Sequence, residues 1–191
     1  LEYLQSIPSF CRENNLASHL DGARVFNAAV ASRVSLDKIS RNFDSLSICL
    51  SKGLGTPIGS VLCGSRELIK EARKYRKMLG GGMRQAGIVA AAGLYALDNN
   101  IERLAEDHAN AQLLATELAQ IDGIELVTVN TNMLFIKVAQ RYTGLRESLF
   151  QHGVILPKAA NKAGLIRLAT HLDVSHNDIL RVVTEIKQFM R

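Results

Sequence analysis

The stretch SLSICLSKGLG, residues 45–55, decides the fold and points to the chemistry. Small or polar residues alternate with Leu or Ile as far as Leu50, which is typical of a buried strand. Lys52 stands at the end of that strand, where burying an unpaired ammonium group is costly. Gly53 and Gly55 let backbone and ligand approach closely. A desolvated lysine becomes the nucleophilic amine that a Schiff base with a carbonyl cofactor requires, whereas the alternative is a lysine that extends to water.

Asp21 follows the short strand expected at residues 17–20. Apolar helical turns at residues 26–31 and 36–43 supply a crossover to the next strand, so the two strands should run parallel. Open α/β sheets bind ligands at the carboxyl ends of their strands. We therefore expect Asp21 and Lys52 to face one crevice. The alternative for Asp21 alone is a helix N-cap or an Asx turn.

The composition is that of an ordinary globular protein, since 47% of the 191 residues are hydrophobic and 21% are charged. No apolar run is long enough to cross a bilayer, and no signal peptide is visible in a chain that begins at Leu1. The cysteines, Cys11, Cys49 and Cys63, lack metal-type spacing. We expect a reduced, cytoplasmic protein without a metal site or a membrane partner.

The formal net charge of +5 derives mostly from residues 66–77, which read as a basic amphipathic helix. Most such helix faces are simply solvated. A nucleic-acid partner is not expected, because neither interleaved aromatic residues nor a recognised binding motif accompanies the charges. The glycine-rich segments 53–59 and 80–85 also fail the spacing rules of the dinucleotide and P-loop motifs.

The pattern predicts further elements along the first half of the chain. A strand at residues 59–64 should run antiparallel, because only residues 53–58 separate it from the lysine strand. Ser65 can cap the basic helix. The other expected helices cover residues 3–15, interrupted by Pro8, then 83–97, tightly packed, and 102–120, in which His108 reads as a packed residue rather than a ligand.

After Asp122-Gly123 the pattern changes to alternating short strands and helices. Strands are expected at residues 125–129, 133–138 and 165–169, and helices at residues 145–152 and 175–190. This pattern indicates a smaller α+β domain. The predicted organisation is α/β, with one domain over residues 1–100 and the smaller domain over residues 101–191.

Several blocks of the chain together resemble the threonine aldolases, which are pyridoxal-phosphate enzymes of the aspartate-aminotransferase fold (fold type I). The blocks are HLDGAR at residues 19–24, SICLSKGLG at 47–55, RKMLGGGMRQ at 76–85, TNM at 131–133 and RLATH at 167–171. The resemblance implies that the first domain is the C-terminal part of a three-layer α/β/α cofactor-binding domain.

The resemblance also implies roles for individual residues. Lys52 matches the Schiff-base lysine, and Asp21 matches the aspartate that pairs with the pyridine nitrogen. Arg24 matches an arginine near the phenolic oxygen of the cofactor and the substrate carboxylate, and Arg167 matches the small-domain arginine that binds that carboxylate. Further contributors near the phosphate or the pocket rim are Ser51, Lys77 and Arg84.

The family's chain is longer at its amino end. There it carries part of the sheet, the phosphate-binding backbone, a ring-stacking histidine and a serine that helps hold the carboxylate. The resemblance thus implies that this chain is a C-terminal portion, whose partners are the missing N-terminal part and further copies in a homodimer or homotetramer. No base for the substrate's β-hydroxyl group is identified in this chain.

The reaction that the resemblance implies is retro-aldol cleavage of L-threonine or L-allo-threonine to glycine and acetaldehyde. Two alternatives remain open. One is another fold-type I enzyme, such as a β-eliminating lyase or an aminotransferase. The other is a non-catalytic binding module.

Overall fold

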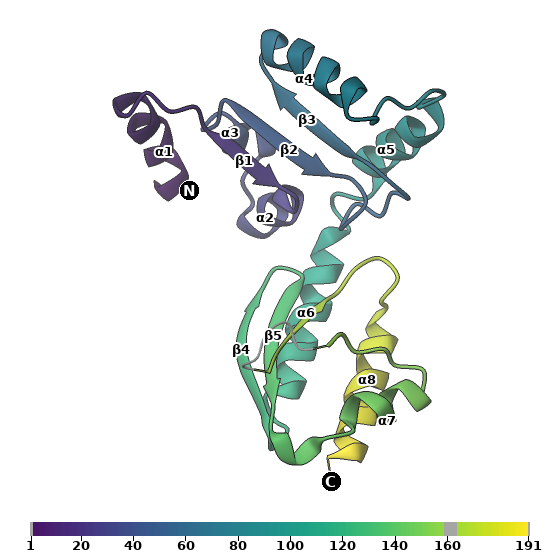
Figure 1. Ribbon diagram of the computed structural model, residues 1–191. Coiled ribbons are helices and arrows are strands. Elements are labelled where there is room, and N and C mark those ends of the chain that lie inside the picture. Colours follow the sequence, from purple (N-terminus) through teal and green to yellow (C-terminus); the bar gives the residue numbers. More distant parts are fainter. Residues whose placement is uncertain (1, 159–163, 191) are drawn as a thin grey trace. The chain divides into compact units, whose positions relative to one another are not determined.

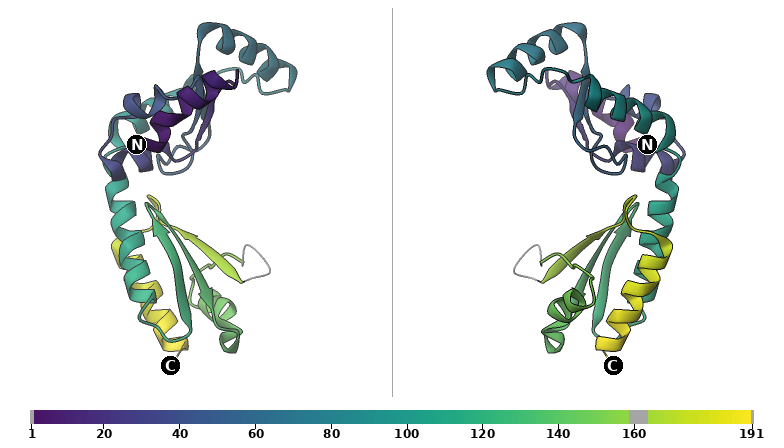
Figure 2. Two further views of the ribbon diagram at one scale, coloured as in Figure 1. Left: turned by 90° about the vertical axis from the view of Figure 1, so that its left-hand side faces the viewer. Right: turned by 90° about the vertical axis from the view of Figure 1, so that its right-hand side faces the viewer.

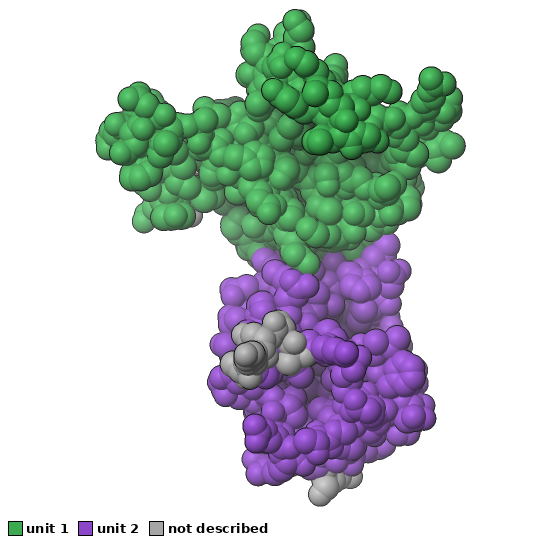
Figure 3. Space-filling model, in the orientation of Figure 1, with its two compact units in different colours: residues 1–104 green, residues 105–191 purple. Residues whose placement is uncertain are grey.

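A computed structural model describes residues 2–158 and 164–190. The chain divides into two compact units, residues 1–104 and residues 105–191 (Figure 3). Each unit has its own three-stranded sheet and its own hydrophobic core. Among the described residues, no helix combines the length and the apolar character that crossing a bilayer requires.

The sheet of the first unit has the order β1-β2-β3. Its strands are β1 (His19–Gly22), β2 (Ser45–Cys49) and β3 (Ser60–Gly64). Strand β1 pairs parallel with β2, and β3 pairs antiparallel with β2. The antiparallel prediction is confirmed, because the connection from Cys49 to Ser60 is too short for a crossover.

The alternating sequence of β2 sorts its side chains between the two faces of the sheet. Leu46 and Ile48 are buried, whereas the residues between and beside them are only partly buried. The buried face shares its core with α2 (Val25–Ser32) and α3 (Leu36–Ser40), which form the crossover from β1 to β2 (Figure 1). Burial of these apolar side chains therefore fixes the crossover against the sheet.

Helix α1 (Glu2–Glu13) runs through Pro8 without a break, so the expected interruption is wrong. A proline within a helix removes one backbone hydrogen bond and strains the preceding turn, but it need not end the helix. Helix α1 has no buried residue, although Leu4 packs against the core of the first unit from a partly buried position.

The last helices of this unit are α4 (Arg66–Met78) and α5 (Gly87–Asn99). The predicted cap of α4 is confirmed, because the Ser65 hydroxyl accepts a hydrogen bond from the Leu68 amide. Helix α5 begins later than expected and is not tightly packed. Its buried residues are Gly93 and Ala96, while Ile88 is 80% exposed. The apolar composition of α5 therefore exceeds what this unit buries.

The second unit is a sheet of order β4-β5-β6 with helices on it. Its elements are α6 (Leu104–Leu118), β4 (Ile124–Asn130), β5 (Met133–Val138), the 3-10 turn η1 (Gln140–Tyr142), α7 (Leu145–Gln151), β6 (Leu165–Ala169) and α8 (His176–Phe189). All of its strand pairs are antiparallel. Helices α6 and α8 lie along the same face of the sheet (Figure 2).

One continuous core joins this sheet to α6, α7 and α8. The predicted strands and helices of the second unit are confirmed, and β5 and β6 match their expected bounds. His108 on α6 is half-buried, and this burial lowers its pKa. That environment is typical of a packed histidine, as expected from the sequence.

The core of the second unit predicts a large effect for Ile136, which is 1% exposed on the central strand β5. Ile136→Ala should lower the free energy of unfolding of this unit by about 2–5 kcal/mol, because a cavity adds to the lost burial. Native-state hydrogen exchange of the amides in β5 and α8 measures the change. The control is Leu180→Ala on the exposed side of α8. Equal losses of protection in the two variants would contradict the core assignment.

Candidate functional site

Asp21 lies near the carboxyl end of β1, opposite Ser47 of the parallel strand β2. Its Oδ1 accepts a hydrogen bond from the Ala23 amide at 3.1 Å. This bond is the Asx turn that the sequence left as an alternative. The turn and a ligand-binding role are compatible, because the carboxylate is exposed and stands at the end of the sheet where α/β folds bind ligands.

Lys52 is on a turn beyond the end of β2, since the strand closes at Cys49. Both Asp21 and the lysine turn therefore follow the same end of two neighbouring parallel strands. The expectation of a desolvated lysine is wrong for this structure, because Lys52 is exposed. The physical reason is that the turn carries Lys52 past the sheet, where no described side chain covers it.

The turn that carries Lys52 is nevertheless anchored. The Gly55 amide donates to the Lys52 carbonyl at 2.9 Å, and Gly55 has a φ of 72°, a conformation that favours glycine. Leu54 is buried, and the Asn100 side chain donates to its carbonyl oxygen at 2.8 Å. Contacts inside and beneath the turn thus fix the backbone on both sides of Lys52.

Gly53 allows this turn to sit close to the protein. A Cβ at this position would come within 2.9 Å of both Asn27 Oδ1 and Leu104 Cδ2. The sequence predicted that this glycine allows close approach of a ligand, whereas in the structure the close approach is to the buried side chains of Asn27 and Leu104, both in the first unit. Any larger residue at position 53 must push the turn outward.

Arg24 is the N-cap residue of α2, three positions after Asp21. Its Nε is a buried donor without a hydrogen-bond partner, which is rare in folded proteins. Asp21 and Arg24 line the same pocket, of about 450 Å³, between β1 and the helices around it. Lys52 is not among the residues that line it, so this pocket is not the expected crevice shared by Asp21 and Lys52.

Cys49 and Ser51 flank the start of the lysine turn, with 3.6 Å between the Cys49 Sγ and the Ser51 Oγ. Partial burial raises the pKa of the Cys49 thiol. Hydrogen bonds with Ser51 and the positive charge of Lys52 outweigh that effect, so the pKa lies below its usual value. The surroundings of Cys49 therefore favour its thiolate form.

The remaining predicted residues lie on other elements. Lys77 is in the last turn of α4, and its Cδ would meet a Cβ at Gly82 at 2.9 Å. Arg84 is exposed in the segment between α4 and α5. Arg167 is exposed on β6 in the second unit, opposite Phe135 of β5. In the structure, Asp21 and Arg24 thus share one pocket, whereas Lys77, Arg84 and Arg167 lie on separate elements.

Sequence reasoning missed the supporting residues Asn27 and Asn100. Asn27 is 2% exposed within the apolar helix α2, and Asn100 follows α5. Asn27 could have been found from the sequence, because it is a polar residue on an otherwise apolar helix face. Nothing in the sequence links Asn100 to the lysine turn, because its partner Leu54 is 46 positions away.

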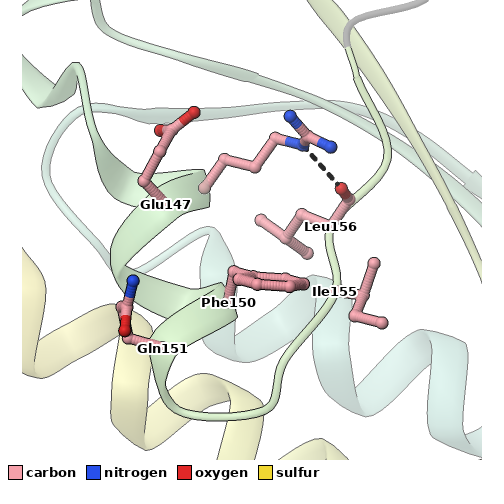
Figure 4. A pocket seen from close by; sticks show the side chains of 6 residues that line it. Glu147, Phe150, Gln151, Ile155 and Leu156 are labelled. Atoms are coloured by element: carbon pink, nitrogen blue, oxygen red, sulfur yellow. Dashed lines mark hydrogen bonds between the residues drawn. The ribbon is translucent and has the colours of Figure 1, made fainter.

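A separate pocket of about 270 Å³ lies beside α7 in the second unit (Figure 4). The ring of Phe150 stands between α7 and the loop that carries Ile155 and Leu156. Arg146 closes one side, where its Nε donates to the Leu156 carbonyl at 3.0 Å. None of the predicted site residues lines this pocket.

Comparison with known proteins shows the family. The model of the beta-eliminating lyase family matches residues 1–141. The low specificity L-threonine aldolase of Escherichia coli strain K12 is 48% identical over 190 residues, which cover 99% of this chain and 56% of that protein. The low-specificity L-threonine aldolase 1 of Arabidopsis thaliana is 38% identical over 196 residues, which cover 100% of this chain and 54% of that protein. The chain thus spans about half the length of these relatives.

Solved structures confirm the predicted fold. A threonine aldolase from Leishmania major superposes with a TM-score of 0.82 at 24% identity, covering 100% of this chain and 56% of that chain. Mouse CSAD superposes with a TM-score of 0.74 at 17% identity, covering 98% of this chain and 48% of that chain. At such identities the likeness concerns the fold alone.

The low pKa of Cys49 predicts how its alkylation depends on pH. Iodoacetamide reacts with the thiolate, so the reaction at Cys49 should rise at a lower pH than for an ordinary cysteine. Lys52→Gln removes a charge that stabilises the thiolate and should shift this profile to higher pH. Peptide-resolved mass spectrometry of the protein without added cofactor measures both profiles. The control Lys70→Gln on α4 should change nothing, and an unshifted profile in Lys52→Gln would contradict the proximity.

Proposed function

The chain belongs to the beta-eliminating lyase family, and from this premise we propose that it forms the C-terminal part of a pyridoxal-phosphate-dependent threonine aldolase. The reaction would be retro-aldol cleavage of L-threonine or L-allo-threonine to glycine and acetaldehyde. The observation that carries the proposal is the parallel pairing of β1 with β2, which gives Asp21 and the Lys52 turn a common end of the sheet. The names of the relatives from Escherichia coli and Arabidopsis thaliana support the choice of substrate.

The residues at this end of the sheet fit the cofactor. Arg24 Nε is a buried donor that lacks an acceptor, and pyridoxal phosphate offers acceptor oxygens. The carboxylate of Asp21 lines the same pocket and suits a ring nitrogen that carries a proton. When bound, pyridoxal phosphate supplies an electron sink for the carbanion that bond cleavage leaves.

We assign the cofactor contacts as follows. Lys52 Nζ would form the covalent bond to the cofactor's carbonyl carbon, and Asp21 would hold a proton at the pyridine nitrogen. Arg24 would donate to the phenolic oxygen or to the substrate carboxylate. Ser51 and Arg84 would make further contacts near the phosphate. The carboxylate of Asp21 would raise the pKa of the ring nitrogen by about 1–3 units, which keeps that nitrogen protonated.

Arginine residues would make the main contacts with the substrate. Arg167 and Arg24 would bind the carboxylate of the β-hydroxy amino acid, because a planar guanidinium group can pair with both carboxylate oxygens. Lys77 would add positive charge at the pocket rim. Fixing the carboxylate limits rotation at the α-carbon, so the bond to be broken can be held in the reactive direction.

We further propose that residues 1–100 belong to the cofactor-binding domain and residues 101–191 to the small domain of a larger cytoplasmic homodimer or homotetramer. The exposed apolar residues of α5 support this, because such surfaces usually mark interaction sites. The remaining phosphate and ring-stacking contacts would come from the N-terminal portion of the same protein.

The decisive test uses the polypeptide in which that N-terminal portion precedes this chain. Borohydride reduction followed by peptide mapping should place a pyridoxyl group on Lys52, and the protein should release glycine from threonine. Lys52→Ala should abolish both signals, whereas Lys70→Ala on α4 should preserve them. Residues 1–191 alone should be inactive and weakly folded as a whole. A label on Lys77 with Lys52 unmodified would refute the lysine assignment, and pyruvate or transamination products would favour the other fold-type I reactions.

Asp21→Ala should weaken cofactor binding without abolishing it and lower kcat by about 10- to 1,000-fold. The reason is loss of the proton on the ring nitrogen. The carboxylate would raise the pKa of that nitrogen by about 1–3 units, and each unit corresponds to about 1.4 kcal/mol, or a factor of about ten. Steady-state kinetics and cofactor titration measure the two effects. The matched control is Asp37→Ala, an exposed carboxylate on α3 that pairs with Arg41. Turnover in Asp21→Ala that equals the control would leave Asp21 with only its Asx turn.

A further inference from the structure

Buried hydrogen bonds hold the carboxyl end of β6. They connect it to the turn between β4 and β5 and to helix α6. Thr170, the residue after β6, donates from its amide to the Asn132 carbonyl at 2.9 Å, and the Asn132 side-chain Nδ2 donates to the Thr170 carbonyl at 2.8 Å. The Thr170 hydroxyl donates to the Asp107 carbonyl at 2.6 Å. The end of β6 is thereby tied both to the turn between β4 and β5 and to helix α6.

The residues that make these hydrogen bonds are almost completely removed from water. Asn132 is 3% exposed and Thr170 is 2% exposed. The side-chain Oδ1 of Asn132 is buried without a hydrogen bond. What the asparagine supplies is the Nδ2 donor that holds the Thr170 carbonyl.

Arg167 lies on β6, three positions before Thr170, so these hydrogen bonds act on the strand that carries it. Strand β6 is at the edge of the sheet, where β5 is its hydrogen-bonded neighbour in the described sheet. Leu168 is buried and Arg167 is exposed, so the strand presents Arg167 on the face opposite its core contacts. The bonds of Thr170 thus fix the backbone that carries Arg167 without touching its guanidinium group.

We propose that Asn132 and Thr170 are positioning residues, which set the direction of Arg167 by fixing the end of β6. The inference rests on the proposed function, in which Arg167 binds the substrate carboxylate. Pairing through two parallel hydrogen bonds depends strongly on direction, and small displacements of a binding group reduce catalysis steeply. Without this anchor, the end of β6 would be held by its ladder with β5 alone.

The test compares variants of the complete polypeptide that contains this chain. Thr170→Val keeps the shape but removes the hydroxyl donor, while Thr170→Ser keeps the donor. Asn132→Asp keeps the shape and replaces the Nδ2 donor with an oxygen that faces the Thr170 carbonyl. Thr170→Val and Asn132→Asp should each raise the KM for threonine about five- to tenfold, with kcat and cofactor affinity within about twofold of the parent. Thr170→Ser should restore the parent KM.

A double-mutant cycle with Arg167→Lys separates positioning from general stability. Arg167→Lys removes the planar guanidinium group. If Thr170 acts through Arg167, then Thr170→Val should raise the KM by less than about twofold in that background. A merely structural role predicts the same factor in both backgrounds. Asn132→Asp provides a second cycle with the same expectation, and bound cofactor verifies that each variant is folded.

The outcomes distinguish this inference from the proposed function. Equal effects in both Arg167 backgrounds, or equal losses of kcat and cofactor affinity, would overturn the positioning role and leave the proposed function intact. An unmodified parent that fails to cleave threonine would remove the function and the inference together. Raised KM values that disappear in the Arg167→Lys background support the inference.

Discussion

The parallel pairing of β1 with β2 is the constraint on which the site of the first unit depends. The ladder sets Asp21 opposite Ser47, so Asp21 and the Lys52 turn follow the same end of the sheet. An antiparallel pairing would have put the lysine at the opposite end. Parallel strands need a crossover of a dozen or more residues, and α2 and α3 supply it while burying the core face of β2. The placement of the proposed site residues in this unit therefore depends on its helix packing.

Each unit also holds one buried polar atom that lacks a hydrogen bond, and each is close in sequence or structure to a proposed substrate-binding arginine. In the first unit it is Arg24 Nε itself, and in the second it is Asn132 Oδ1, next to the end of the strand that carries Arg167. Such atoms cost about 1–3 kcal/mol each. They are the only buried side-chain nitrogen or oxygen atoms of this kind in the part of the chain that the structure describes. Functional sites are where folded proteins tolerate this cost.

The sequence was most informative where local patterns determine structure. Period-two alternation predicted β2, and the short connection after Cys49 predicted the antiparallel β3. It was wrong about α1, which continues through Pro8 because a proline need not end a helix, and about α5, whose apolar surface stays exposed. The hydrogen bonds of Asn100 and Asn132 could not be predicted because their partners lie 46 and 38 positions away in the sequence. The exposure of Lys52 depends on what covers the turn, which local sequence does not encode.

The two units differ in how completely they bury their apolar residues, and this difference bears on catalysis. In the second unit, the helices pack against the sheet in one continuous core. In the first unit, Ile88, Leu94 and Tyr95 of α5 are each more than half exposed, and Lys52 is exposed as well. A helix that is apolar all round is stable when other protein covers it. Protein that covered Lys52 as well would exclude water from its amine, and a desolvated lysine is the better nucleophile.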